Sequence, residues 1–277
     1  MRPRELVEAT GGRFSVELGI DLSSLQPNEL FKWLLASLLF GARISRKIAG
    51  RTYRSFEKHG ALSIESILAK GWQDLVEILD KGGYARYDFK TAAKLLEVAE
   101  NLKSRYGGDL NRLHSESSGP ADLENRLMAL GKGIGPVTTN IFLREMRGLW
   151  EKAQPALSRP AIIAARELGY LPEHPGNEGR TLLILTRIWA DSGTFPDFEA
   201  ALLKWWMLKK GRPGKNWRRH ACKIAENRSD EQGIRQGKRG RGWFRGIPLP
   251  SVFAPVREHY IPGKPELLQP RDDAGDR

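Results

Sequence analysis

Residues 127–140 read Leu-Met-Ala-Leu-Gly-Lys-Gly-Ile-Gly-Pro-Val-Thr-Thr-Asn, and this stretch decides the expected fold. Apolar residues at helical spacing precede the glycines from Leu123 and follow them to Met146. Because alternate glycines followed by a proline interrupt a helix, the pattern predicts two short helices joined by a tight turn. We therefore expect a helix-hairpin-helix over about Leu123 to Arg147.

The glycine turn is also the strongest candidate for a binding site. A turn without side chains lets backbone N–H groups approach a phosphate, and Pro136 suits the first position of a helix whose positive dipole end faces the same anion. Such contacts position a protein on a strand without reading its sequence. Tight packing between helices, without any ligand, is the alternative explanation. The residues expected at the phosphate are Gly131, Lys132, Gly133, Ile134, Gly135, Val137 and Thr138.

Helical periodicity extends through most of the chain. The stretch from Leu30 to Leu39 is apolar on most of its circumference and predicts a buried core helix. Strand-like alternation is almost absent, so the expected fold class is all-α. A basic amphipathic helix is predicted over 45–59, and further helices over 63–70, 73–79, 88–106, 161–168, 180–190 and 198–208. Ser63 and Asp88 are the expected N-caps of two of them, and Leu182, Leu185, Ile188 and Trp189 are among the expected buried residues.

The length of 277 residues is enough for two lobes. We expect a central helical lobe over 25–132, which leads into the hairpin, and a second helical lobe made of 1–24 with 133–208. The composition changes after Leu208: residues 209–246 hold thirteen Lys/Arg against three Asp/Glu. We expect 209–277 to be a basic, partly extended C-terminal region.

The charge balance points to an anionic partner. The net charge is +12 and the pI is about 9.9, which suits nucleic acid or an acidic membrane surface. The single Cys222 excludes disulfide frameworks and multi-cysteine metal sites, and the five histidines show no ligand spacing, so no metal or cofactor is expected. No apolar run of about 18 residues and no signal peptide is found. We expect a monomer inside the cell, either cytoplasmic and nucleoid-associated or nuclear, without membrane contact.

The span from Leu25 to about Gly148 resembles the helix-hairpin-helix DNA glycosylases of the endonuclease III superfamily. Residues 34–43 resemble their first core helix, 87–96 the loop and helix ahead of the hairpin, and 127–140 the hairpin itself. The resemblance implies a two-lobed glycosylase-like fold with a basic C-terminal extension. It also implies double-stranded DNA as the partner, damaged or bent, and base excision after the base is flipped out of the duplex.

The chain departs from this family at the catalytic positions. Val137 stands where bifunctional members carry their lysine nucleophile, and residues 153–160 hold no carboxylate where the family's aspartate is expected. The nearest acids, Glu145 and Glu151, are the candidate catalytic residues, although solvated helix-face charges are the simpler explanation. Lys132 is the only amine expected near the turn. Any excision should therefore be that of a monofunctional DNA glycosylase.

Other positions are expected to contact DNA. Ala42 and Arg43 follow the first core helix, at the place where the family inserts a residue into the gap left by the flipped base. Arg43, Arg46 and Lys47 form a basic cluster that is expected to line a DNA groove, and an ordinary basic surface is the alternative. The loop that contains Tyr84 and Tyr87 is expected to reach the duplex, and closure of this loop over the core is the alternative. Trp205 and Trp206 are expected in the core. The remaining predicted contacts are Tyr84, Arg86 and Tyr87 in that loop, and Lys215, Arg218 and Arg219 in the basic segment.

Three functions remain open from the sequence. The first is a DNA glycosylase of the base-excision-repair type with relocated catalytic groups. The second is a non-catalytic protein that recognises bent or damaged DNA. The third is an RNA-binding or nucleoid-type protein that uses the basic C-terminal region as its main surface, with the hairpin serving only for packing.

Overall fold

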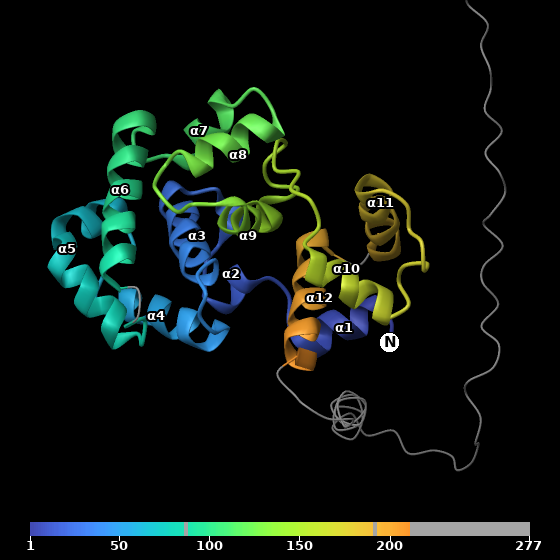
Figure 1. Ribbon diagram of the computed structural model, residues 1–277. Helices are drawn as coiled ribbons and strands as arrows, with labels where there is room; N and C mark the ends of the chain where they lie inside the picture. The colour runs from blue at the N-terminus through green and yellow to red at the C-terminus, as the bar shows by residue number, and fades with distance from the viewer. Residues whose placement is uncertain (86–87, 191–192, 211–277) are drawn as a thin grey trace, which may run out of the picture. The chain divides into compact units, whose positions relative to one another are not determined.

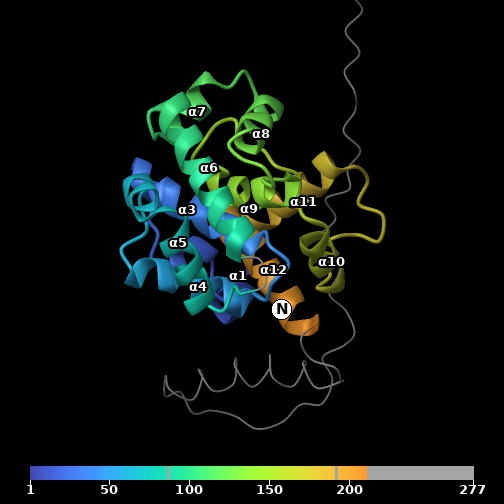
Figure 2. The same ribbon diagram turned by 60° about the vertical axis from the view of Figure 1, so that its left-hand side comes forward.

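The part of the chain that the structure describes folds into helices. The structure is a computed structural model, and it describes residues 1–85, 88–190 and 193–210. These residues form no β-strand, only an isolated bridge between Arg147 and Trp150, which confirms the all-α prediction. Figures 1 and 2 show the arrangement. The helices are α1 (Pro3–Thr10), α2 (Phe14–Glu17), the 3-10 turn η1 (Leu22–Ser24), α3 (Pro27–Phe40), α4 (Arg46–Lys58), α5 (Ile64–Lys81), α6 (Asp88–Tyr106), α7 (Leu110–Glu116), α8 (Pro120–Met128), α9 (Pro136–Met146), α10 (Arg159–Glu167), α11 (Glu178–Trp189) and α12 (Phe195–Lys210).

Helix α3 is the central helix of the fold. Its residues from Leu30 to Leu39 are buried except Lys32, because apolar side chains face almost every direction. It contacts α4, α7 and α9. The indole Nε1 of Trp33 donates to the carbonyl oxygen of Phe142 at 3.1 Å, which satisfies a buried polar atom and joins α3 to α9. The predicted buried core helix is confirmed.

The helices contact one another in two groups. Helices α3 to α9 form one group around α3, and α1, α10, α11 and α12 form the other. Figure 1 shows the two groups next to each other. Helix α9 packs against α3 and α8 in the first group and against α12 in the second, so it links them. Because α9 contacts helices of both groups, the lobe boundary between residues 132 and 133 stays a prediction. All described residues lie within one compact unit, Met1–Gln232.

Two predicted helix starts have different outcomes. The hydroxyl of Ser63 accepts the N–H of Ser66 at 3.1 Å, so the predicted cap is confirmed. The helices predicted over 63–70 and 73–79 are the two halves of α5, which bends at Gly71 with φ 66°. Asp88 is not an N-cap, because α6 begins at Asp88 itself and its Oδ1 accepts the adjacent N–H of Phe89.

Burial also corrects one core prediction and adds three helices. Ile188 is 38% exposed, whereas Leu185 and Trp189 on the same helix are buried. Helices α1, α2 and α7 were not predicted from the sequence. They are short, at most eight residues, and short helices carry too few apolar repeats for periodicity to indicate them.

Candidate nucleic-acid interface

The hairpin has the predicted form: α8, a turn over residues 129–135, and α9. Leu130 and Ile134 are buried and fix the turn to the core, while the N–H of Ile134 donates to the carbonyl of Gly131 at 3.1 Å. Figure 1 shows the two helices meeting at this turn. The prediction of two short helices joined by a glycine turn is confirmed.

The three glycines of the turn serve three different purposes. A Cβ at Gly131 would lie 2.8 Å from Cγ2 of Val98, so this glycine allows the turn to pack against α6. Gly133 has φ +85°, a conformation that favours glycine. At Gly135 a Cβ would meet nothing within 4 Å. Packing therefore explains Gly131, chain reversal explains Gly133, and only Gly135 leaves open space at the start of α9.

That open space is lined by unused backbone donors. In the described part of the chain, the N–H groups of Gly133, Gly135, Val137 and Thr138 donate to no protein acceptor. Pro136, between them, has no N–H. The side chain of Val137 is 65% exposed, so solvent reaches this helix end. Free amides and the positive end of the α9 dipole together make an arrangement that binds anions.

Two of the predicted phosphate contacts are used inside the protein. The N–H of Lys132 donates to Oε2 of Glu97 at 3.1 Å, although its side chain is exposed and free to approach a phosphate. Thr138 is buried, and a Cβ at Gly41 would lie 2.3 Å from its hydroxyl oxygen. Only the backbone of Thr138 therefore remains available, because its side chain packs against the end of α3.

A second amine lies at the turn, which corrects the expectation that Lys132 is alone. Nζ of Lys94, on α6, donates to the carbonyl oxygen of Gly133 at 3.3 Å. Burial lowers the pKa of Lys94. The two residues are 39 positions apart, so no local spacing could have indicated this contact. Lys94 supports the turn from beneath and adds positive charge beside the free amides.

The end of α3 and the start of α4 lie beside the hairpin. The close approach of Gly41 to Thr138 brings the connection from α3 to α4 against the first turn of α9. Ala42 in this connection is half-buried and Arg43 is exposed. The structure thus brings together the hairpin and the residues predicted to follow the first core helix.

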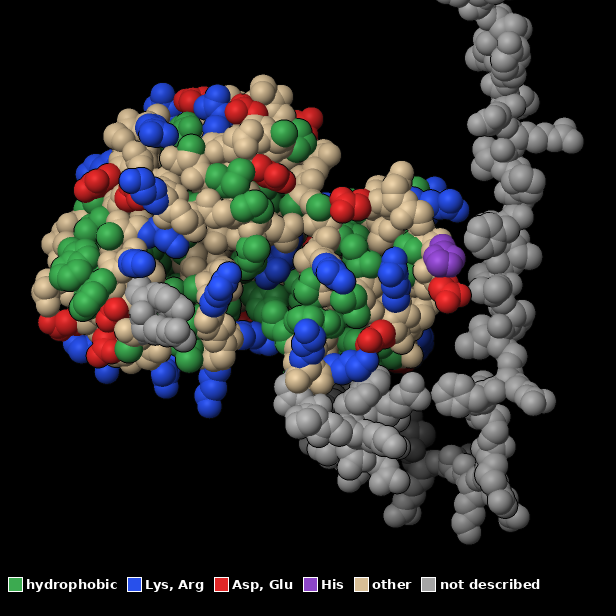
Figure 3. All heavy atoms as spheres, in the orientation of Figure 1, with side chains coloured by type: hydrophobic (Ala, Val, Ile, Leu, Met, Phe, Trp, Pro, Cys, Tyr) green, Lys and Arg blue, Asp and Glu red, His purple; other side chains and the backbone are tan. Residues whose placement is uncertain are grey.

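Helix α4 continues this surface as a basic face. Ser45 caps it, with its hydroxyl accepting the N–H of Ile48 at 3.2 Å. Figure 3 shows Lys and Arg side chains along the lower edge of the molecule, over α4. A pocket of about 540 Å³ lies between α2, the end of α3 and α4. Its lining residues are Glu17, Leu18, Phe40, Arg46, Lys47, Gly50, Arg51 and Arg54.

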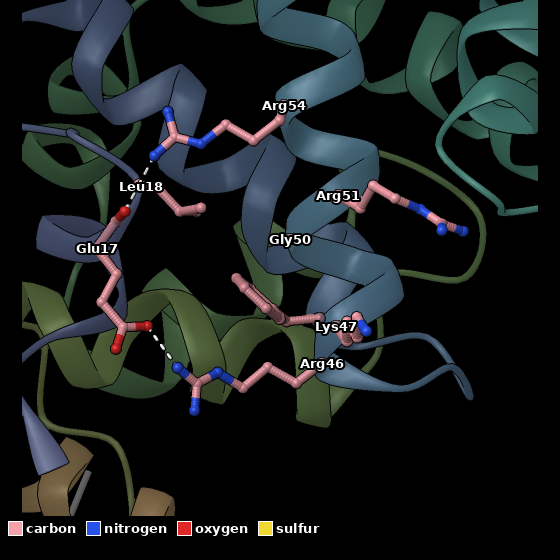
Figure 4. Close-up of a pocket in the computed structure, with 8 residues that line it drawn as sticks. Glu17, Leu18, Arg46, Lys47, Gly50, Arg51 and Arg54 are labelled. Atoms are coloured by element: carbon pink, nitrogen blue, oxygen red, sulfur yellow. Dashed lines mark hydrogen bonds and ion pairs between the residues drawn. The ribbon is translucent and has the colours of Figure 1, made fainter.

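Glu17, at the end of α2, organises the cations of this pocket (Figure 4). Nη2 of Arg46 lies 2.6 Å from its Oε2, and Nζ of Lys204 lies 2.9 Å from its Oε1. Nη2 of Arg54 donates to its backbone oxygen at 3.0 Å. In Figure 4, Arg46 and Arg54 reach toward Glu17 while Arg51 points the other way. The sequence prediction missed Glu17, Arg51, Arg54 and Lys204. The basic residues of α4 recur every three to five residues, which is a signal for the two arginines.

The tyrosine loop does not supply the predicted surface contact at its first tyrosine. Tyr84 is 4% exposed, and its hydroxyl lies 3.3 Å from that of Thr91, so Tyr84 closes the loop over the core. Arg86 and Tyr87 lie outside the described residues. The exposed aromatic pair next to this loop is Trp72 with Phe89, whose ring centroids are 5.3 Å apart.

The candidate catalytic acids lie at the wrong end of α9. Glu145 is buried, not a solvated face charge: its Oε1 and Oε2 accept the N–H groups of Phe14 at 2.7 Å and Ser15 at 2.9 Å, which caps α2. Burial raises the pKa of Glu145. Glu151 is exposed in the turn after α9. Both are separated from Val137 by about two or more helical turns, because eight residues of α-helix rise about 12 Å.

Further buried charges surround the same end of α9. Arg144 and Glu199 are both buried, and Arg147 Nη2 lies 3.6 Å from Oε2 of Glu199. Burial raises the pKa of Glu199 and lowers that of Arg144. The group joins α9 to α2 and α12 and lines no described pocket. Its position indicates that these charges hold the two helix groups together.

Comparison with protein-family models, with curated proteins and with solved structures gave no match. Among the described residues, no cluster of His, Cys, Asp and Glu could hold a metal ion, and no helix is long and apolar enough to cross a membrane. Lys215, Arg218 and Arg219, and with them most of the basic C-terminal region, lie outside the described residues. The functional assignment therefore rests on the geometry of the hairpin and of α4.

Proposed function

We propose that the chain binds duplex DNA through its phosphate backbone, as a divergent member of the helix-hairpin-helix glycosylase superfamily that it resembles. The observation that carries the proposal is the set of free amides at the start of α9, with open space at Gly135. These donors face the surface, and Lys94 and Lys132 add positive charge beside them. An oxygen-rich anion such as a phosphate satisfies all of these groups at once.

Recognition without catalysis is the form of this function that the observations support best. Val137 cannot act as a nucleophile, and both carboxylate oxygens of Glu145 are occupied in capping α2. A glycosidase-type mechanism needs a carboxylate next to the sugar. Monofunctional base excision is the alternative, and incubation with duplexes that carry damaged bases tests it: release of a free base would establish catalysis.

A salt titration of DNA binding tests the proposal itself. The full chain is titrated against several unrelated labelled duplexes between low and moderate salt, with duplex RNA as competitor. We expect similar affinities for all DNA sequences and a log–log slope of several units, because each neutralised phosphate contributes about 0.9. A slope near zero would contradict the proposal. Preference for RNA with no response to hairpin substitutions would instead support the third function, in which the C-terminal region binds.

A further inference from the structure

The pocket beside α4 has the chemistry of an anion site that is closed by the protein's own carboxylate. Residues 43–58 carry six Lys/Arg and one Asp/Glu. In Figure 4 the guanidinium of Arg46 donates to the carboxylate of Glu17, and the guanidinium of Arg54 donates to the backbone oxygen of Glu17. Leu18 and Phe40 contribute apolar lining. Glu17 thus holds the position that an external anion would take.

The cations of the pocket differ in availability. Lys47 is exposed and, within the described residues, has no acidic partner. Arg46 is bound to the carboxylate of Glu17, whose side chain is 40% exposed, so solvent ions reach this pair. Arg51 is not available, since its Nε donates to the carbonyl of Gly82 at 2.7 Å. Arg54 is held by the carboxylate of Glu57 at 2.8 Å and by the backbone oxygen of Glu17. Arg46 and Lys47 are therefore the groups that an anion would contact.

We propose that this pocket is a second phosphate site for the DNA held by the hairpin, and that Glu17 occupies it in the free protein as an internal counter-ion. The inference rests on the proposed function, because it takes the same ligand. When a phosphate arrives, it displaces the carboxylate from Arg46, while Lys204 keeps its contact with Glu17. Binding of DNA at the hairpin and release of the Glu17 carboxylate from Arg46 are then coupled, because the same DNA contacts both sites.

The two sites are neighbours in the fold. The connection before α4 lies against the start of α9, and α4 has 13 residues, a length of about 20 Å. Phosphates of one strand are spaced about 3.4 Å along the axis of B-DNA. A backbone that contacts the hairpin therefore has further phosphates within reach of α4 without bending.

The test compares Glu17→Gln with Glu116→Gln in the full chain. The two glutamates are matched: Glu116 is 39% exposed and lies near Arg112 and Arg126, as Glu17 is 40% exposed and lies near Arg46 and Lys204. Both changes remove one negative charge, so the net charge of the protein rises by one. We expect Glu17→Gln to tighten DNA binding about threefold, within the range of exposed ion pairs. We also expect a log–log salt slope steeper by about 0.9. The phosphate that Arg46 neutralises releases its condensed cation, and in Glu17→Gln there is no displaced carboxylate to take up a cation in exchange.

Arg46→Gln keeps the inference testable if Glu17→Gln destabilises the fold through Lys204. It should weaken binding about threefold while Arg112→Gln has no effect, and it should cancel the gain when combined with Glu17→Gln. Equal slopes for Glu17→Gln and Glu116→Gln would overturn the inference, as would equal binding by the two arginine variants. Binding of phosphatidylcholine–phosphatidylserine vesicles in place of DNA, strengthened by Glu17→Gln, would overturn the choice of nucleic acid.

The same binding series separates this inference from the proposed function. If a substitution at Gly135 abolishes binding and Glu17→Gln changes nothing, the hairpin proposal stands and the second site is refuted. If substitution at Gly135 has no effect and Glu17→Gln tightens binding, the pocket is supported as a phosphate site and the hairpin proposal is refuted.

Discussion

Replacing Gly135 with aspartate separates phosphate binding from folding more clearly than any other change. Gly135 is the N-cap of α9, with φ −113° and ψ −178°, an extended conformation that any residue adopts. A Cβ there meets nothing within 4 Å. Aspartate is a preferred N-cap residue, and its carboxylate would accept the free N–H of Val137 or Thr138. The variant thus fills the proposed phosphate site with a permanent anion and leaves the fold intact.

The two expected effects have opposite signs. Aspartate in place of glycine at an N-cap stabilises a protein by a few tenths of a kcal/mol, so Tm should stay constant or rise by about 1 °C. Hydrogen bonds to a charged partner contribute about 1.5–3 kcal/mol, which corresponds to about tenfold to hundredfold in Kd. We therefore expect DNA affinity to fall by about that factor and the salt slope to become shallower by about 0.9.

Gly119→Asp is the matched control. Gly119 is the N-cap of α8, is followed by Pro120 as Gly135 is followed by Pro136, and also has open space at its Cβ. Fluorescence anisotropy of a labelled duplex measures binding, and thermal unfolding measures stability. The reasoning would be falsified if Gly135→Asp bound DNA like the unsubstituted chain, or if Gly119→Asp lost affinity to the same extent.

Three further predictions concern charge, chemistry and pH. Residues 211–277 hold fifteen Lys/Arg and eight Asp/Glu, so a chain ending at Lys210 loses seven of the twelve net positive charges. The salt slope of its DNA binding should fall, and Gly135→Asp should still weaken the DNA binding of the shortened chain. Loss of cooperative melting would show that the removed region is structural. Borohydride should trap no covalent intermediate between the unsubstituted chain and abasic DNA. Val137→Lys should introduce slow trapping, because it restores an amine nucleophile. Efficient trapping by the unsubstituted chain would point to an unrecognised nucleophile such as Lys94. Because burial raises the pKa of both Glu199 and Glu145, the folded state favours their protonated forms, so stability should decline as the pH rises above the usual glutamate range. Glu199→Gln should make this decline smaller, and Glu145 should account for the remainder; unfolding curves at several pH values measure both.

The sequence could predict the features that are encoded locally. The hairpin is specified by fourteen consecutive residues, and Ser63, the cap of α5, stands directly before an apolar repeat. The burial of α3 follows from its nearly uniform apolar composition. Each of these depends on neighbours within about two helical turns, where periodicity and capping preferences act.

The sequence could not predict contacts that depend on distant residues. Glu145 stands next to Arg144, as a residue of a charged surface would, yet it receives two N–H groups from residues about 130 positions earlier. A buried carboxylate is tolerated only because those donors meet it. Tyr84 likewise belongs to a polar loop in sequence but is enclosed by the core in three dimensions. Local patterns describe a side chain's own element and not the elements packed against it.

The two ends of α9 lie in different environments, and this difference bears on the affinity of the proposed phosphate site. Its last turns are fixed by Trp33 of α3, by the buried Arg144 and Glu145 and by the half-buried Arg147, which reach α2 and α12. Its first turn carries the free amides of Val137 and Thr138. Because the helix is held at one end, the amides at the other end are oriented before a ligand arrives, and binding costs little conformational entropy. Substitutions in the buried charges should therefore lower Tm and DNA affinity together, whereas Gly135→Asp should lower affinity alone. If Glu145→Gln lowered Tm and left the affinity of the folded protein unchanged, pre-orientation of α9 would not contribute to binding.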